Sequence, residues 1–363
     1  MSENPIIKAP RREQLCSLTL DELKERIKQI GEPAFRAQQI FEWIYRKGAA
    51  SFDAMTNLSK EFRTRLEELF QFPAICLVDT QQSEETMKFL WELSDGKRVE
   101  SVLIQSYDRR TVCLSSQVGC SGRCAFCASG RSGLIRSLSC GEIIEQALHI
   151  DRYLREKGER VCHIVYMGMG EPLENYGAVV KSIRILNDEN SLHISQRRIT
   201  VSTVGIVEGI HRLAKEDFKV NLALSLHAPS QQIRQKIIPF AKKYPLEEVL
   251  MAVDDYGRLT KRDITYEYTL IADVNDSLMH AAQLVSLLRG KQCTVNLIPY
   301  NPIENSRLQR PKEARITRFR EILNEGGINA TWRYTKGSEI SAACGQLALP
   351  AGQIKYTPID QKL

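Results

Sequence analysis

The sequence predicts an α/β protein in which six strand–helix units form a full or partial barrel of parallel strands, after a helical segment and a β-hairpin. Apolar residues recur at helical spacing in residues 19–69, which predicts helices. Two alternating apolar runs then flank Asp95-Gly96, which predicts the hairpin. From residue 111 onward, strand-like and helix-like stretches alternate, which favours a parallel sheet.

The helical segment occupies residues 1–84, which we interpret as an accessory domain. Its first helix is predicted over Thr19–Gly31, with Thr19 as the N-cap and Gly31 as the end. A second helix is predicted over Pro33–Gly48, and Ser59 is a candidate N-cap of the third. The side chains predicted to be buried are Leu20, Leu23, Ile27, Ile30, Phe35, Ile40, Phe41, Ile44, Phe62, Leu66 and Leu69.

A hairpin connector follows at residues 85–105. Its strands are "MKFLWEL" (87–93) and "RVESVLI" (98–104), joined by Ser94-Asp95-Gly96. An Asp-Gly pair between alternating apolar residues is a strong hairpin signal. The second strand brings Glu100 just upstream of the next motif.

The barrel is predicted over residues 106–347, with a tail at 348–363. Ser139 and Glu142 form a capping-box pattern at the start of its clearest helix. Active sites of such barrels lie at the carboxyl ends of the strands, where several polar motifs of this sequence fall. The predicted strands are 111–117, 161–168, 198–205, 220–228, 265–271 and 293–299.

Composition and charge narrow the class of protein. Of 363 residues, 43% are hydrophobic and 26% charged, and no apolar run reaches the roughly 18 to 20 residues that span a bilayer. The stretch "MSENPIIKAPRREQL" does not resemble a signal peptide, so we expect a cytoplasmic protein. The net charge is −3 over residues 1–96 and +9 over residues 97–363, an excess that suits a polyanion such as RNA.

Ten cysteines in a reducing compartment indicate metal or redox chemistry. Three of them, Cys120, Cys124 and Cys127, lie in "VGCSGRCAFCASG". Three thiolates fit a zinc site with a distant fourth ligand or an open position, or a cubane iron–sulfur cluster with one iron free of protein ligands. We expect five other cysteines to be small buried hydrophobic residues: Cys16, Cys76, Cys140, Cys162 and Cys293.

The spacing Cys-x3-Cys-x2-Cys, with Phe126 before the last cysteine, resembles the signature of radical S-adenosylmethionine (SAM) enzymes. The stretch "YMGMGEPLEN" (166–175) is similar to the glycine–glutamate turn that binds the methionyl amine in that superfamily. Cys113 in "TVCLSSQVGC" and Cys344 in "GSEISAACGQL", with "LSLHAP" and "LIPYNP", extend the resemblance. From about Ala34 to Leu347, the chain resembles the RlmN and Cfr type of ribosomal RNA adenine methyltransferases.

The resemblance implies a partial (β/α)6 radical SAM barrel that holds a [4Fe–4S] cluster and uses two SAM molecules per turnover. Cys344 would accept a methyl group from the first SAM. The cluster, held by the three clustered cysteines, would cleave the second, and the resulting radical would activate the methyl group on Cys344 for addition to the adenine ring. Glu100 would remove the ring proton. Cys113 would then attack the Cys344 sulfur, releasing the base and leaving a transient disulfide.

The same resemblance implies the remaining site residues and partners. The substrate would be C2 of an adenosine in 23S ribosomal RNA at the peptidyl-transferase centre, with an anticodon-loop adenosine of tRNA as a possible second substrate. The N-terminal helices would contribute to RNA binding, and a flavodoxin or ferredoxin would donate the electron. We expect a monomer with no membrane contact. The residues expected to contact SAM are Gly170, Glu171, Ser202, Ser225, Leu226, His227 and Asn301.

Three alternatives stay open at this point. A Cfr-like enzyme would methylate C8 of adenine and confer antibiotic resistance. A non-catalytic iron–sulfur RNA-binding protein would have no need of Cys113, Cys344 and Glu100 together. A zinc-dependent RNA enzyme would contain zinc and no iron. The sequence also departs from the family pattern at Glu339-Ile340-Ser341 and at Ile104-Gln105, which leaves the surroundings of Cys344 open.

Overall fold

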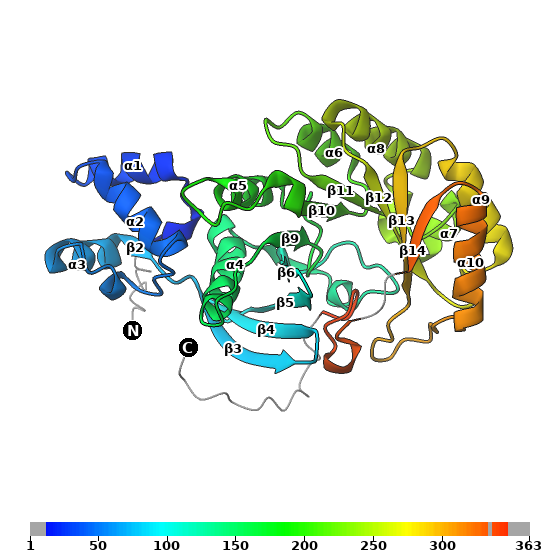
Figure 1. The fold of residues 1–363 in the computed structure, drawn as a ribbon, viewed down its shortest axis with the longest axis horizontal. Coiled ribbons are helices and arrows are strands. Elements are labelled where there is room, and N and C mark those ends of the chain that lie inside the picture. Colours follow the sequence, from blue (N-terminus) through cyan, green and yellow to red (C-terminus); the bar gives the residue numbers. More distant parts are fainter. Residues whose placement is uncertain (1–11, 333–335, 348–363) are drawn as a thin grey trace, which may run out of the picture.

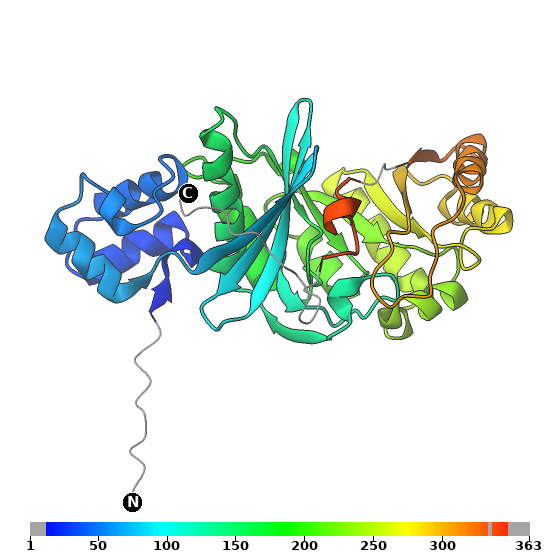
Figure 2. The same cartoon turned by 90° about the horizontal axis from the view of Figure 1, so that it is seen from below.

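The computed structural model describes residues 12–332 and 336–347. A helical unit lies at one end of the molecule (Figures 1 and 2). It contains α1 (Leu20–Gln29), α2 (Phe35–Tyr45) and α3 (Lys60–Leu69), and the short β1 (Glu13–Gln14) pairs in parallel with β2 (Phe70–Gln71). All three predicted helices are confirmed. The side chains of Thr19 and Ser59 cap α1 and α3 as expected.

Two burial predictions in this unit are wrong. Phe35 is 56% exposed, and Leu69 is 39% exposed. Both residues lie at a helix terminus, where the neighbouring turn that would cover an apolar face is missing. The Phe35 ring is instead covered by its neighbour, because the Arg36 guanidinium lies 5.0 Å from the ring centroid.

The rest of the molecule is built around one ten-stranded sheet. Its strand order is β14-β13-β12-β11-β10-β9-β6-β5-β4-β3. The strands β6 and β9 to β14 pair in parallel, whereas β3 to β6 pair in antiparallel fashion. The bounds are β3 (Ile75–Gln82), β4 (Thr86–Leu93), β5 (Arg98–Ser106), β6 (Arg109–Cys113), β9 (His163–Tyr166), β10 (Ile199–Thr203), β11 (Asn221–Ser225), β12 (Ile264–Leu270), β13 (Cys293–Pro299) and β14 (Asn329–Trp332).

The six predicted barrel strands are confirmed as β6 and β9 to β13, and the predicted hairpin is confirmed as β4 and β5. Two strands of this ten-stranded sheet were not predicted. β14 adds a seventh parallel strand, and β3 pairs with β4, so the hairpin is continuous with the barrel sheet. A separate ribbon of β7 (Gln117–Gly119) and β8 (Leu134–Ser137) frames the loop that carries the three clustered cysteines.

Helices flank the parallel strands (Figure 1). The capping box of Ser139 and Glu142 is confirmed at the start of α4. Glu145 on α4 accepts hydrogen bonds from the backbone N–H groups of Ala74 and Ile75, and this fastens the start of β3 to the barrel. The helices of the barrel are α4 (Cys140–Arg155), α5 (Tyr176–Asn187), α6 (Val207–Ala214), α7 (Gln231–Ile237), α8 (Leu246–Thr260), α9 (Leu278–Leu288) and α10 (Glu313–Glu325).

A C-terminal segment, residues 336–347, lies between the β4–β5 hairpin and the barrel strands (Figures 1 and 2). It includes a short 3-10 helix, Ser338–Ile340. The ammonium of Lys336 forms an ion pair with Glu85, next to β4, and a Cβ on Gly337 would lie 2.4 Å from Oγ1 of Thr86. The segment is therefore packed closely on the hairpin.

The isolated cysteines are mostly shielded as expected. Cys16 and Cys140 are buried, and Cys162 and Cys293 are half-buried. Cys76 is exposed, because it lies on the edge strand β3, and the prediction that it is buried is wrong. Within the described ranges, no helix is both long and apolar enough to cross a membrane.

Candidate active site

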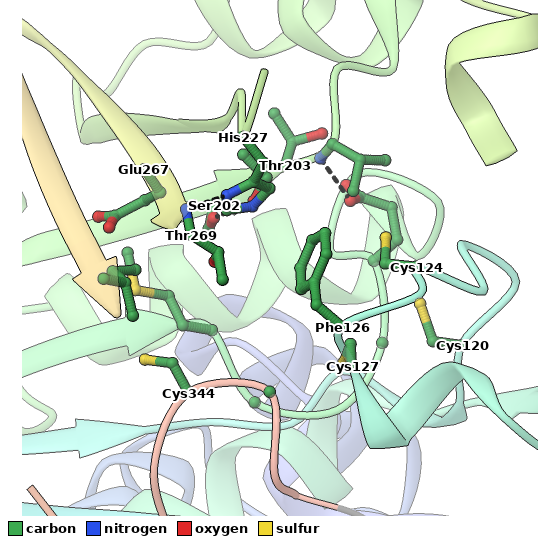
Figure 3. Close-up of a pocket in the computed structure, with 18 of the residues that line it drawn as sticks. Cys120, Cys124, Phe126, Cys127, Ser202, Thr203, His227, Glu267, Thr269 and Cys344 are labelled. Carbon is green, nitrogen blue, oxygen red and sulfur yellow. Dashed lines mark hydrogen bonds between the residues drawn. The ribbon is translucent and has the colours of Figure 1, made fainter. Parts of the chain in front are cut away.

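Two adjoining cavities open at the carboxyl ends of the parallel strands. The first is lined by all three clustered cysteines and by most of the residues expected to contact SAM (Figure 3). The second is lined by Cys113 and by residues of β5 and of the C-terminal segment. Five residues line both cavities: Cys127, Met167, Gly168, Cys344 and Gly345.

The cysteine loop forms one wall of the first cavity. Burial raises the pKa of all three thiols, that of Cys120 to about 12. Buried thiols of this kind become thiolates when they bind a metal. Gly122 keeps the space beside them open, because a Cβ there would lie 3.3 Å from Sγ of Cys120 and 3.7 Å from Sγ of Cys124.

These features fit an iron–sulfur cluster held by three thiolates. Among the residues that the structure describes, no three His, Cys, Asp or Glu side chains converge closely enough to hold a single metal ion. The three thiols line a cavity and do not surround one point. Cys124 also lies near the buried guanidinium of Arg234, a positive charge that favours a thiolate.

The Gly170-Glu171 turn after β9 is fixed by its neighbours. Gly170 has φ +103°, and a Cβ there would lie 2.6 Å from Cβ of Gln117, so only glycine fits. The Glu171 backbone N–H donates to Oε1 of Gln117 at 2.8 Å. Its carboxylate accepts from the N–H groups of Leu173 and Val204, at 3.0 and 2.9 Å. The Glu171 side chain therefore ties the turn to β10, although burial raises its pKa to about 7.

Polar groups from β10 and β11 face the cysteine loop across the first cavity (Figure 3). The hydroxyl oxygens of Ser202 and Ser225 lie 3.5 Å apart. Nδ1 of His227 accepts a hydrogen bond of 2.8 Å from the N–H of Thr269, and burial lowers the pKa of this imidazole to about 3. His227 is therefore neutral near pH 7, with its proton on Nε2, where it can donate to a ligand.

Cys344 is held at the border of the two cavities by contacts to its neighbours. The side-chain amide of Asn301, after β13, donates to the Cys344 carbonyl at 3.0 Å. The N–H of Ala128, in the cysteine loop, donates to the Gly345 carbonyl at 2.7 Å. Gly345 has φ +84°, and a Cβ there would lie 2.9 Å from the Phe126 carbonyl oxygen. The segment is thereby tied to both the cysteine loop and the barrel, with Cys344 itself exposed.

Cys113 approaches the same border from the sheet. It is the last residue of β6, is 8% exposed, and pairs in register with Val102 on β5. Cys113, Val102 and Cys344 all line the second cavity. The structure therefore brings the two cysteines singled out in the sequence to one cavity, although 230 positions separate them in the chain.

Glu100 lies deeper in the sheet than expected for a base that must reach a substrate. Its side chain is 0% exposed, on β5, and it is not among the lining residues of either cavity. Residues 100 and 102 of a strand point to the same side of the sheet. Val102 lines the second cavity. Glu100, two residues before Val102 on β5, therefore belongs to the same wall.

Leu226 also departs from its expected place, because its side chain is 0% exposed and packs in the main core. Three further residues that shape the site were not predicted. Gln117 clamps the glycine turn, and Glu267 and Thr269 on β12 line the first cavity. The alternation of polar residues in "TYEYTL" is the signal that could have found the last two, because polar side chains recur on one face of a buried strand.

Comparisons with known proteins agree with this geometry. The sequence model of the Ribosomal RNA large subunit methyltransferase N-terminal domain matches residues 13–72, and that of the Radical SAM superfamily matches residues 114–285. A curated relative from Protochlamydia amoebophila, "Probable dual-specificity RNA methyltransferase RlmN 2", is 60% identical over 90% of this chain and 92% of its own length. Another, from Dictyoglomus thermophilum, "Probable dual-specificity RNA methyltransferase RlmN", is 46% identical over 92% of this chain and 96% of its own length.

A solved structure shares the whole architecture. The crystal structure of a radical SAM methyltransferase from Sphaerobacter thermophilus superimposes with a TM-score of 0.91 and 46% sequence identity, covering 92% of this chain and 99% of that one. Membership of the radical SAM superfamily implies a [4Fe–4S] cluster and SAM, in accord with the buried thiols of the first cavity. The chain thus belongs to the RlmN family of radical SAM RNA methyltransferases.

Proposed function

We propose that this enzyme methylates C2 of an adenosine in 23S ribosomal RNA, at the peptidyl-transferase centre, and an adenosine beside the anticodon of tRNA. One observation carries the proposal: Cys344 lines both the cavity of the cysteine loop and the cavity of Cys113. A residue in that position can receive a methyl group on one side and meet a resolving thiol on the other. The dual-specificity names of the relatives support two classes of RNA substrate.

The residues of the first cavity would hold the cofactors. When bound, the cluster and two SAM molecules per turnover supply the methyl group and the one-electron chemistry that activates it, with flavodoxin or ferredoxin as the electron donor. Cys120, Cys124 and Cys127 would be the cluster ligands. The SAM contacts would come from Gly170, Glu171, Ser202, Ser225, His227 and Asn301, while Leu226 would hold the end of β11 by its packing.

Three side chains would carry the covalent steps. The Cys344 thiolate attacks the SAM methyl carbon, so an S–C bond forms on Cys344 as the sulfonium S–C bond breaks. After the methyl carbon has bonded to the base, Glu100 accepts the ring proton, and the cluster, when bound, would supply the acceptor for the one electron that must also leave to restore the aromatic ring. Cys113 then attacks the Cys344 sulfur as a thiolate. A disulfide forms, the S–C bond to the base breaks, and its electron pair stays with the methylated base, which takes up a proton.

The RNA would approach the half of the chain with net charge +9, because phosphate neutralisation drives association. Residues 1–96, which include the N-terminal unit, carry a net charge of −3, so the RNA contacts of that unit would come from local basic groups such as Arg36 and Arg46. We propose that the enzyme acts as a cytoplasmic monomer.

Nucleoside mass spectrometry with chromatographic standards tests the proposal. Anaerobically reconstituted protein is given SAM, a reductant and unmodified fragments of 23S rRNA and of tRNA, with Cys344→Ala as the control. We expect 2-methyladenosine from both RNAs and none from the control. Formation of 8-methyladenosine would assign the enzyme to the Cfr-like group instead.

The same preparation distinguishes the other two classes of protein. RNA binding by the cluster-loaded protein, without any methylated nucleoside, would indicate a non-catalytic iron–sulfur protein. Stoichiometric zinc with no iron would indicate a zinc enzyme. Either result would contradict the proposed function.

A further inference from the structure

A buried lysine lies beside the carboxylate of Glu100, which lines neither of the two cavities described above. Lys88 on β4 is 4% exposed, and its Nζ lies 3.1 Å from Oε1 of Glu100, which is 0% exposed. Lys and Glu are almost never buried to this degree unless they are paired. A carboxylate so far from water would take up a proton if no positive charge stood next to it.

The register of the hairpin directs this ion pair toward the reactive cysteines. Lys88 pairs with Val102, and Glu100 pairs with Leu90, so Lys88 and Glu100 are diagonal neighbours on one face of the sheet. Val102 is on that face too, and it pairs with Cys113 and lines the second cavity. The ion pair is therefore continuous with the wall of the cavity that Cys113 and Cys344 share.

A second carboxylate lies on the same face of the sheet and is within electrostatic range of the ammonium. Asp79 on β3 pairs with Leu90, which places it on the same face, and it is 6% exposed. The positive charge of Lys88 lowers the pKa of Asp79, but burial has the larger effect and raises it overall. Three strands thus place one ammonium and two buried carboxylates on one face of the sheet, with Glu100 as the ion-pair partner of Lys88.

We propose that Lys88 is a positioning residue for Glu100: it keeps this carboxylate ionised and directed along the sheet toward the cavity of the two cysteines, and Asp79 keeps Lys88 charged once Glu100 is protonated. The inference rests on the proposed role of Glu100 as the base. In that step one proton leaves the adenine ring carbon and binds the Glu100 carboxylate, and the single electron that must also leave the ring would pass to the bound cluster, so Glu100 itself changes only its protonation.

A rate profile against pH tests this inference in Lys88→Met, with wild type alongside. Without the ammonium, Glu100 is protonated at pH 7 and regains its charge only at higher pH. We expect formation of methylated RNA to be at least tenfold slower than in wild type at pH 7 and to recover as the pH rises, since general bases contribute about 10²- to 10⁴-fold. The transfer of a methyl group to Cys344, monitored by peptide mass spectrometry, should proceed as in wild type.

The pH profile of the rate separates a positioning role of Lys88 from a structural one. A packing defect would slow the reaction by the same factor at all pH values. Equal rates for Lys88→Met and wild type at pH 7, or a pH-independent defect, would overturn the inference. If wild type itself makes no methyladenosine, the proposed function is wrong. If wild type makes methyladenosine but Lys88→Met shows no pH-dependent defect, only the role of Lys88 is wrong.

A second measurement needs neither cofactors nor a Lys88 variant. The infrared difference spectrum between wild type and Glu100→Gln at pH 7 should contain the band of an ionised carboxylate. The band of a protonated carboxylic acid in its place would overturn the inference. The other titratable groups around this face, Asp79 on β3, Cys113 on β6 and Cys344 in the C-terminal segment, are common to both proteins, so their bands cancel unless the substitution alters their protonation.

The unfolding free energy gives a third comparison. In Lys88→Met the raised pKa of Glu100 should make the protein lose stability as the pH rises from 5 to 8, because the folded state then holds a proton that it must release. The Lys88→Met/Glu100→Gln double variant should lack this additional slope. Equal slopes in the single and double variants would show that Lys88 does not control the charge of Glu100.

Discussion

The side-chain amide of Asn301 donates a hydrogen bond of 3.0 Å to the main-chain carbonyl of Cys344. The contact joins the end of β13 to the segment that carries the reactive thiol, so a residue expected to contact SAM also sets the position of the nucleophile. The interaction passes through the backbone of Cys344, and the sulfur stays free to react.

Asn301→Asp should loosen this segment. The variant keeps the size of the side chain but cannot donate, so the Cys344 carbonyl loses a bond worth about 1 kcal/mol. We expect faster amide hydrogen exchange in residues 338–347 in protein without cofactors, and methyl transfer to Cys344 reduced about fivefold. Unchanged exchange with slower transfer would assign Asn301 to SAM binding alone.

Gly345→Ala should displace the same segment more strongly. The added Cβ would lie 2.9 Å from the Phe126 carbonyl oxygen, in a backbone conformation of φ +84° that alanine rarely adopts. We expect at least a hundredfold loss of methylated RNA with the secondary structure retained. Gly290→Ala is the matched control, because its φ is +76° and no atom lies within 4 Å of the added Cβ. Equal losses in the two variants would indicate general backbone strain.

Cys113→Ala should stop the reaction after the base has bonded to Cys344. No other cysteine side chain lines the second cavity apart from Cys127 and Cys344, and Cys127 is a proposed cluster ligand. We expect a covalent protein–RNA adduct, visible on a denaturing gel and lost on ribonuclease treatment. Cys76→Ala, at an exposed position on β3, should behave as wild type. Release of methylated RNA at the wild-type rate would remove Cys113 from the mechanism.

The stability of the protein should fall between pH 5 and pH 8 because of Glu145. Burial raises the pKa of this carboxyl from 4.5 to about 7 in the folded protein. A raised carboxyl pKa gives stability that is complete below pH 4.5 and is lost as the pH rises through about 7. Glu145→Gln keeps an acceptor for the N–H groups of Ala74 and Ile75. Between pH 5 and pH 8, the unfolding free energy of this variant should therefore change by about 2–3 kcal/mol less than that of wild type.

Chemical denaturation at several pH values measures this difference. Some pH dependence should persist in Glu145→Gln, because burial also raises the pKa of Glu171 to about 7. A variant with the same slope as wild type would mean that Glu145 is ionised in the folded protein.

The elements that the sequence predicts well are those with a strong local signal. The N-cap at Thr19, the capping box at Ser139 and the Asp95-Gly96 turn were found because each depends on neighbouring residues. β3 and β14 were missed because each lies at an edge of the sheet, where one side of the strand needs no apolar partner. Phe35 was misplaced because helical periodicity does not indicate what lies beyond the end of a helix.

The site residues divide in the same way. The three clustered cysteines follow from spacing within one loop, whereas the contact of Asn301 with the Cys344 backbone depends on a fold that brings together distant parts of the chain. The Lys88–Glu100 pair depends on the register of β4 and β5. A lysine within an otherwise apolar strand was a visible signal, but its partner is fixed only by the pairing of the strands.

The C-terminal segment packs on β4 and the cysteine loop, and this has a consequence for biosynthesis. Residues 120–127 and the walls of both cavities up to β13 leave the ribosome well before Cys344 does. A growing chain can therefore shape the place for its cluster while it still lacks the thiol that accepts the methyl group. Translation has to pass Cys344 before the nucleophile and its resolving partner can meet, so a chain terminated before this residue would lack the thiol needed to bond to RNA.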